Sequence, residues 1–172
     1  MQGLDNLVAW AKSQMEGLNI TNQSFNLNIV LGELENELQN LVITKKINLV
    51  LEKDANVKIK ADKEMIKSAL RNLLTNALKF SNQKQTVSLS IEDGGSIVEI
   101  KIKDEAEGIP KNLQNQIFKE PLKSASGTRG ERGSGIGLLL VKEFVNLNGG
   151  EIKFESTENV GTTFTLTLNK AF

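Results

Sequence analysis

The feature that most constrains the fold is a change of hydrophobic period in the middle of the chain. Apolar residues occupy every second position in two segments, Val87-Leu89-Ile91 and Val98-Ile100-Ile102, and Asp93-Gly94-Gly95 lies between them. Side chains of a strand alternate between its two faces, so each segment is predicted to be a half-buried strand. An Asp-Gly pair between two such segments predicts a tight hairpin.

Segments with helical period lie on both sides of this hairpin. We expect helices over residues 4–18, 29–42, 62–80 and 136–147, a short helix near 110, and further strands over 47–51, 57–59, 152–154 and 164–168. Asp62 is a suitable N-cap for the third of these helices, and the polar residues 17–24 are predicted to be a linker. The pattern indicates an α/β fold class, in which helices cover one face of a sheet.

Composition excludes several classes of function. The 172 residues, 39% of them hydrophobic, can bury one main core, and we expect one domain with an appendage. Lys+Arg and Asp+Glu both number 21, which leaves no charge excess for nucleic acid or an anionic membrane. Neither cysteine nor histidine is present, so disulfides and Ser-His-Asp or Cys-His catalysis are excluded. The helical pattern begins at the first residues, and we expect a fragment of a longer protein.

A glycine-rich loop, Gly133-Ser134-Gly135-Ile136-Gly137-Leu138, leads into the predicted helix 136–147. It lacks the Gly-Lys-Ser/Thr ending of a P-loop, and no strand precedes it as in a dinucleotide-binding turn. Glycines needed only for a flexible linker or for tight packing are one interpretation. The other is an anion site, because a glycine-rich helix start exposes backbone N–H groups at the positive end of the helix dipole.

A group of three residues on a predicted helix and one aspartate on a predicted strand each have a structural and a functional interpretation. Asn72, Asn76 and Lys79 share one face of the predicted helix 62–80, either as its solvated side or as ligands for Mg²⁺ and phosphate. Asp104 has the parity of the buried residues of its strand, where a carboxylate is costly unless it is hydrogen-bonded. It either caps the following turn or accepts a hydrogen bond from an exocyclic amine such as that of adenine.

Five segments, in this order, resemble the sequence boxes of sensor histidine kinases. They are Arg71–Ser81 (N box), Asp104–Pro110 (first glycine box), Ile117-Phe118 (F box), Gly133–Leu138 (second glycine box) and Gly161–Phe164 (final glycine box). The resemblance runs from about Phe25 to the end and implies the ATP-binding domain of the gyrase/chaperone/histidine-kinase/MutL superfamily. That domain has a Bergerat-type fold, a two-layer sandwich with a mixed, mostly antiparallel sheet. Residues 4–12 resemble the end of a dimerisation helix, which implies domains at 1–22 and 23–172.

The resemblance also implies a role for individual residues. Asn76 would bind Mg²⁺ with Asn72 nearby, Lys79 would reach a phosphate, and Asp104 would bind the adenine amine, with Gly108 giving the base room. Residues 119–132 would form a lid over ATP, in which Arg129 and Arg132 neutralise the γ-phosphate. Thr163 would support the adenine site. The remaining expected contacts to the nucleotide are Phe80, Ile109, Gly133, Ser134, Gly135, Ile136, Gly137 and Leu138.

The resemblance predicts a protein-histidine kinase domain that transfers the γ-phosphoryl of Mg-ATP to a histidine outside this chain. Its expected partners are ATP, the histidine-containing dimerisation domain, a response regulator and, in the full-length protein, a second copy; the expected location is cytoplasmic. Ala106 stands where the family usually has glycine, which leaves open a weakened module that binds nucleotide and docks on a partner. An ATPase is disfavoured because Asn72 replaces the glutamate of hydrolytic members, and a serine kinase is disfavoured by the first helix.

Overall fold

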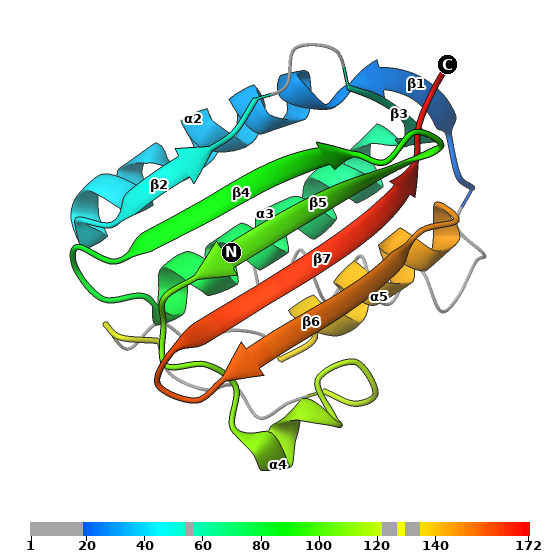
Figure 1. Ribbon diagram of the computed structural model, residues 1–172. Coiled ribbons are helices and arrows are strands. Elements are labelled where there is room, and N and C mark those ends of the chain that lie inside the picture. The colour runs from blue at the N-terminus through cyan, green and yellow to red at the C-terminus, as the bar shows by residue number, and fades with distance from the viewer. Residues whose placement is uncertain (1–18, 54–56, 122–126, 130–134) are drawn as a thin grey trace.

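The computed structural model describes residues 19–53, 57–121, 127–129 and 135–172. A five-stranded sheet has the order β2-β4-β5-β7-β6, formed by β2 (Asn48–Leu51), β4 (Thr86–Asp93), β5 (Ile97–Asp104), β7 (Gly161–Asn169) and β6 (Glu151–Thr157). Only β2 and β4 run parallel, so the sheet is mixed and mostly antiparallel. Helices α2 (Leu27–Lys45), α3 (Lys63–Phe80) and α5 (Gly137–Leu147) cover one face (Figure 1). The predicted two-layer α/β fold is confirmed.

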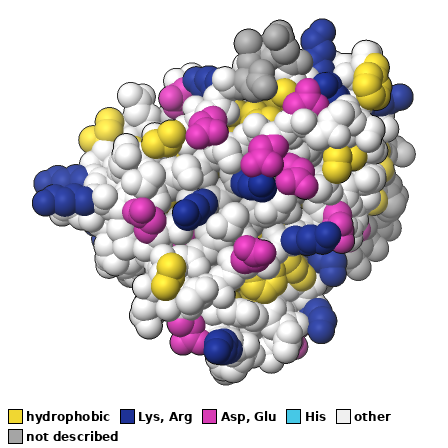
Figure 2. Space-filling model, viewed as in Figure 1, with side chains coloured by type: hydrophobic (Ala, Val, Ile, Leu, Met, Phe, Trp, Pro, Cys, Tyr) yellow, Lys and Arg dark blue, Asp and Glu magenta, His cyan; other side chains and the backbone are white. Residues whose placement is uncertain are grey.

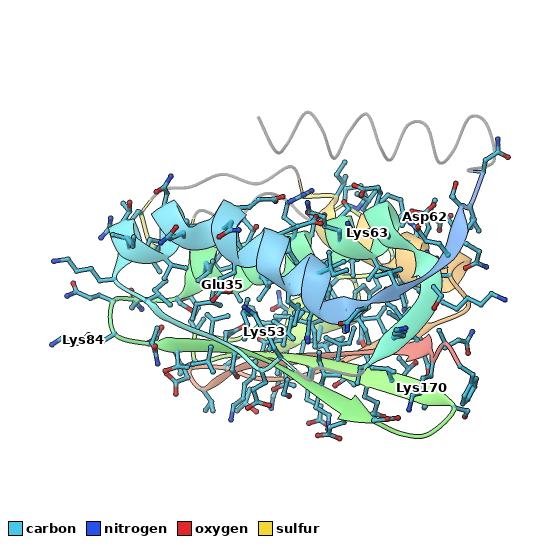
Figure 3. All side chains as sticks on the ribbon, turned by 90° about the horizontal axis from the view of Figure 1, so that it is seen from above. Glu35, Lys53, Asp62, Lys63, Lys84 and Lys170 are labelled. Atoms are coloured by element: carbon cyan, nitrogen blue, oxygen red, sulfur yellow. The ribbon has the colours of Figure 1, made fainter. Side chains whose placement is uncertain are left out.

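The core lies between the sheet and the helices, which Figure 3 shows as two layers seen from above. Alternate residues of the sheet, such as Ile100, Ile102 and Leu166, are at most 1% exposed. They meet the apolar side of α3, where Ile66 and Leu70 are fully buried. The predicted period-two pattern therefore places one face of the central hairpin in the core, as expected.

The outer face of the sheet is polar and faces solvent. Lys101 on β5 lies 2.7 Å from Glu92 on β4, and Lys153 lies 3.2 Å from Glu151 on β6. Figure 2 shows acidic and basic side chains interspersed over this side of the molecule. Such exposed pairs contribute little to stability, because water and salt screen them.

A second, two-stranded sheet formed by β1 (Asn22–Asn26) and β3 (Lys58–Asp62) differs from the prediction. The polar segment 17–24 was expected to be a linker, yet Asn22–Ser24 pairs with β3. The predicted strand 57–59 is confirmed in part, but it joins β1 and not the main sheet. The predicted N-terminal helix over residues 4–18 lies outside the described residues.

Helix α3 begins and ends as the sequence predicts. Asp62 caps its first turn by accepting a hydrogen bond from the backbone N–H of Met65 at 3.1 Å. Asp62 also accepts from Thr21 N, and its own N–H donates to Asn148, at the end of α5. The start of α3 is therefore hydrogen-bonded to the residue before β1 and to the end of α5. The other end of α3 lies at the edge of the sheet where β5 ends.

Candidate functional site

A row of polar side chains crosses the inner face of the sheet where its core ends. Strand register places Leu89, Ile102, Phe164 and Phe154 side by side across β4, β5, β7 and β6. Two residues further towards the end of β5, the neighbouring positions on the same four strands hold Val87, Asp104, Thr162 and Ser156. An apolar row is thus followed by three polar groups at this end of the inner face.

Asp104, the last residue of β5, is 8% exposed. Its Oδ1 atom accepts hydrogen bonds from the backbone N–H of Ala106 at 3.0 Å and of Thr162 at 3.2 Å. Burial raises the pKa of the Asp104 carboxyl above its ordinary value, and the two N–H groups oppose this shift. One carboxylate oxygen is thus held by the backbone on both sides. Among the described residues Oδ2 has no such hydrogen bond, and it is the oxygen that could bind a ligand.

Two glycines allow the backbone to close around Asp104. Gly161 has φ +144°, and a Cβ there would overlap the carbonyl oxygen of Asp104. Gly108 has φ +74°, and a Cβ there would overlap the carbonyl oxygen of Thr157. Both positions therefore exclude a side chain on steric grounds as well as on backbone conformation.

Ala106 does not disturb this turn. It is not among the described non-glycine residues with positive φ, which are Lys46, Lys84 and Asn159. Its N–H also forms one of the two bonds to Asp104. The condition under which alanine can replace glycine here, an ordinary negative φ, is therefore met.

The C-terminal half of α3 carries the other polar residues of the site. Asn72 is 5% exposed, and its amide donates to the Ser68 carbonyl at 2.9 Å, whereas Asn76 is half-buried. Lys79 is 9% exposed, and its ammonium lies 4.8 Å from the centre of the Phe80 ring. Asn72 is thus partly engaged with its own helix, while Asn76 and Lys79 lie nearer the helix end.

The end of α3 is tied to both the sheet edge and the predicted lid. Gln85, in the loop after α3, donates to the Glu105 carbonyl at 2.6 Å, which joins this loop to the residue after Asp104. The Lys79 carbonyl accepts from the buried Lys45 ammonium at 2.7 Å and from Thr128 N at 3.1 Å. Thr128 is therefore anchored on α3, and Arg129 follows it directly.

Helix α5 begins at the same edge as the end of β5 (lower left in Figure 1). Gly135 has φ +75°, Gly137 is the first helical residue, and no side chain caps the helix at Ile136. The first turn also carries no acidic residue. A helix start without negative charge has N–H groups oriented to bind an anion. Gly133, Ser134 and Arg132 lie outside the described residues.

The remaining predicted contacts fall around this edge. Ile109 is half-buried, and its N–H donates to the Ser156 hydroxyl at 2.8 Å. Leu138 is half-buried in the first turn of α5. Phe118 of the F box packs against Phe154 and Phe164, with ring centres 5.8 Å and 6.2 Å away. These rings attach the segment after α4 (Lys111–Gln114) to β6 and β7.

Thr163 lies on the wrong face for its predicted place beside the adenine site. It pairs with Lys103 and Glu155, which are both exposed, so its side chain belongs to the outer face of the sheet. Thr162 is the residue beside Asp104, and it is 5% exposed. The alternation of the strand could have identified it, because Thr162 has the same parity as the buried Phe164 and Leu166.

Over residues 61–171 the sequence matches the family described as "Histidine kinase-, DNA gyrase B-, and HSP90-like ATPase". The chain belongs to this family. The sensor protein EvgS of Escherichia coli (strain K12) is 38% identical over 113 residues, which cover 63% of this chain and 9% of EvgS. WalK of Bacillus subtilis (strain 168) is 36% identical over 110 residues, 62% of this chain and 18% of WalK. The chain therefore spans less than a fifth of either relative.

Solved structures extend the likeness to the fold. The catalytic domain of the histidine kinase ThkA has a TM-score of 0.75 at 25% identity, covering 87% of this chain and 97% of that domain. ShkA in complex with AMPPNP gives 0.81 at 19% identity, and ThkA in complex with the response regulator TrrA gives 0.79 at 22%. Each likeness covers 98% of this chain. The matched part is 35% of the ShkA chain and 47% of the ThkA chain in the complex with TrrA. The chain corresponds to the ATP-binding catalytic domain of bacterial sensor histidine kinases.

Proposed function

We propose that this domain binds Mg-ATP at the edge formed by Asp104, the end of α3 and the start of α5, and transfers the γ-phosphoryl group to a histidine on a neighbouring domain. The observation that carries the proposal is the state of Asp104. Two backbone N–H groups fix Oδ1, and Oδ2 is the acceptor left on a nearly buried carboxylate. An exocyclic amine, such as the 6-amino group of adenine, is the donor that such an acceptor selects.

The turn beside Asp104 fits a flat base. Gly108 lets the turn after Asp104 approach β6, where a Cβ would overlap the Thr157 carbonyl oxygen. The half-buried Ile109 adds apolar surface for the ring. A small number of polar groups within an apolar surface is the usual composition of a small-molecule site.

The phosphates would lie between α3 and α5. The start of α5, with Gly135 and Gly137, has no acidic residue in its first turn and would present backbone N–H groups, and Lys79 would present an ammonium. Gly133 and Ser134 would extend the same loop, and Arg129 and Arg132 would neutralise the γ-phosphate from the lid.

Magnesium fits the residues present. Asn76 supplies a neutral oxygen ligand at the end of α3, with Asn72 one turn before it. The described residues contain no cluster of three His, Cys, Asp or Glu side chains that could hold a metal, so the ion would depend on the phosphates for most of its ligands. When bound, Mg²⁺ would neutralise charge on the phosphates.

The acceptor of the phosphoryl group must come from elsewhere, because the chain contains no histidine. We assign residues 1–22 to the end of a dimerisation helix and its linker, and residues 23–172 to the catalytic domain. The acceptor histidine would belong to that dimerisation domain, and a response regulator would receive the phosphoryl group afterwards. Among the described residues, no helix is long and apolar enough to cross a membrane. We propose a cytoplasmic location, where ATP is available.

The transfer reaction distinguishes this proposal from its alternatives. The chain would be mixed with ATP labelled at the γ-phosphate and with the histidine-containing domain of the same protein. Label on that domain, stable to base and lost in acid, is expected, and the chain alone should remain unlabelled. Acid-stable label on this chain would indicate a serine kinase, and release of inorganic phosphate alone would indicate an ATPase. Bound ATP without either reaction would favour a docking module.

A further inference from the structure

Ser156 on β6 lies at the centre of a hydrogen-bond network that joins the two sides of the proposed adenine site. Its hydroxyl oxygen accepts from Ile109 N at 2.8 Å, lies 2.8 Å from the Thr162 hydroxyl, and lies 3.3 Å from the Gly161 carbonyl oxygen. Ile109 follows Gly108 directly, and Thr162 bonds to Asp104. One hydroxyl therefore contacts both the turn beside the base and the strand that holds the carboxylate.

One arrangement of protons satisfies every contact in this network. A serine hydroxyl can donate one hydrogen bond and accept two. All three contacts are satisfied when Ser156 accepts from Ile109 N and from the Thr162 hydroxyl, and donates to the Gly161 carbonyl. Thr162 has then given its only proton to Ser156. Its oxygen then carries only acceptor lone pairs, in the residue whose backbone N–H bonds to Asp104.

The direction of these hydrogen bonds determines which group of a base the site accepts. An acceptor pair formed by Asp104 and Thr162 matches an amino group, directly or through a water molecule, and repels a carbonyl oxygen. Without the Ser156 hydroxyl, Thr162 could turn its proton towards Asp104, and the Ile109 N–H would lose its acceptor. The preference for a 6-amino purine would then fall.

We propose that Ser156 is a positioning residue for the base: it orients the Thr162 hydroxyl and holds the Gly108-Ile109 turn, and it thereby contributes to selection of the 6-amino group. The inference rests on the proposed function, because it concerns the same nucleotide site. Ser156 is half-buried and shares the inner face of β6 with Ile152 and Phe154. It acts through Thr162 and Ile109 without touching the reacting phosphate.

The test compares two nucleotides in four proteins by calorimetry with Mg²⁺. The nucleotides are a non-hydrolysable ATP analogue and the corresponding triphosphate of purine riboside, which lacks the 6-amino group. Ser156→Ala is expected to weaken binding of the ATP analogue by about 3- to 10-fold, the range of one net hydrogen bond, and to change binding of the other nucleotide less. Ser156→Thr, which keeps the hydroxyl, should restore most of the preference.

Thr162→Val provides the independent arm of the test. It removes the hydroxyl that Ser156 orients, so it should lower the same preference even if Ser156→Ala does not fold. Equal losses for both nucleotides in Ser156→Ala and Thr162→Val, or an unchanged preference in both, would overturn the inference. Failure of the wild-type protein to bind the ATP analogue would instead reject the proposed function, and the inference with it.

Discussion

The backbone N–H of Thr162 donates to Oδ1 of Asp104 at 3.2 Å, and this bond joins the start of β7 to the end of β5. The pair occupies the inner face of the sheet, where the apolar core gives way to polar residues. Thr163, one residue later, lies on the outer face beside Lys103. Two adjacent threonines thus lie on opposite faces of the sheet, so the same substitution at each gives a matched pair of variants.

Replacing these two threonines by valine is expected to give different results. Thr162→Val removes a hydroxyl beside Asp104 and should weaken binding of an ATP analogue by about 3- to 10-fold. Thr163→Val changes only the outer face and should alter affinity by less than about twofold. Calorimetric titration of both variants measures this. Equal effects would show that the strand parity does not determine which threonine serves the site.

Alanine substitutions at two glycines should have opposite effects on stability. Gly161→Ala places a Cβ against the Asp104 carbonyl and forces a positive φ on alanine, at a cost of about 2–5 kcal/mol. Gly32→Ala lies within α2, where an added Cβ would meet nothing within 4 Å, and should stabilise by about 0.5–1 kcal/mol. Urea unfolding measures both. A Gly161→Ala protein as stable as the wild type would contradict the close approach of β7 to Asp104.

An ion-pair network between α2 and α3 predicts how stability depends on pH. Hydrogen bonds from Lys63 and Lys67 to Glu33, at 2.7 Å and 2.6 Å, lower the pKa of Glu33 from 4.5 to about 2. Because the folded pKa is depressed, this stabilisation is present above pH 4.5 and is lost as the pH falls towards 2. Figure 3 labels Lys63 at the start of α3.

The test of this network is urea unfolding of the wild type and Glu33→Gln at several pH values. The wild type should be more stable at neutral pH, and the difference should shrink as the pH falls through the stated window. High salt should reduce the difference at neutral pH, because the pairs are partly exposed to solvent. A difference that does not depend on pH would mean that Glu33 stabilises through packing and not through its charge.

Two asparagines on α3 are expected to affect magnesium differently. Asn76→Ala should remove most of the gain in nucleotide affinity that Mg²⁺ provides and leave affinity without Mg²⁺ nearly unchanged. Asn72 is 5% exposed and donates to the Ser68 carbonyl. Asn72→Ala, unlike Asn76→Ala, should therefore lower the stability of the folded protein, by about 1 kcal/mol. Titrations with and without EDTA, together with thermal unfolding, separate the two effects. A Mg²⁺ gain that survives in Asn76→Ala would remove Asn76 as a ligand.

Local patterns predicted the main layers of this fold because the residues that determine them are near one another in sequence. The alternation over 87–102 defined the central hairpin, and Asp62 defined the start of α3. The pairing of β1 with β3 could not be predicted, because it joins short polar segments on either side of a helix and a further strand. Nothing in the local sequence distinguishes such a segment from a linker.

The burial of a candidate residue was predictable where strand parity shows it, and its contacts were less so where they depend on register. Asp104 stood out as a carboxylate at a buried position, and its burial and raised pKa agree with that interpretation. Ser156 was not identified, because its contacts come from β6–β7 pairing and from a turn on another strand. Thr162 was missed although its parity was visible, because the sequence box alone does not say which of two threonines faces inward.

The measurement that tests the central claim most directly is titration of the wild type and Asp104→Asn with a non-hydrolysable ATP analogue, with and without Mg²⁺. Asparagine can still accept the two backbone hydrogen bonds. Burial raises the pKa of Asp104 above its unfolded value, so burying the charge costs stability at neutral pH. Asparagine carries no charge, and Asp104→Asn should therefore unfold at no lower temperature. Magnesium-dependent binding in the wild type, lost in a fully folded Asp104→Asn, is the predicted result. Equal binding by both proteins, or no binding by the wild type at millimolar analogue, would contradict it.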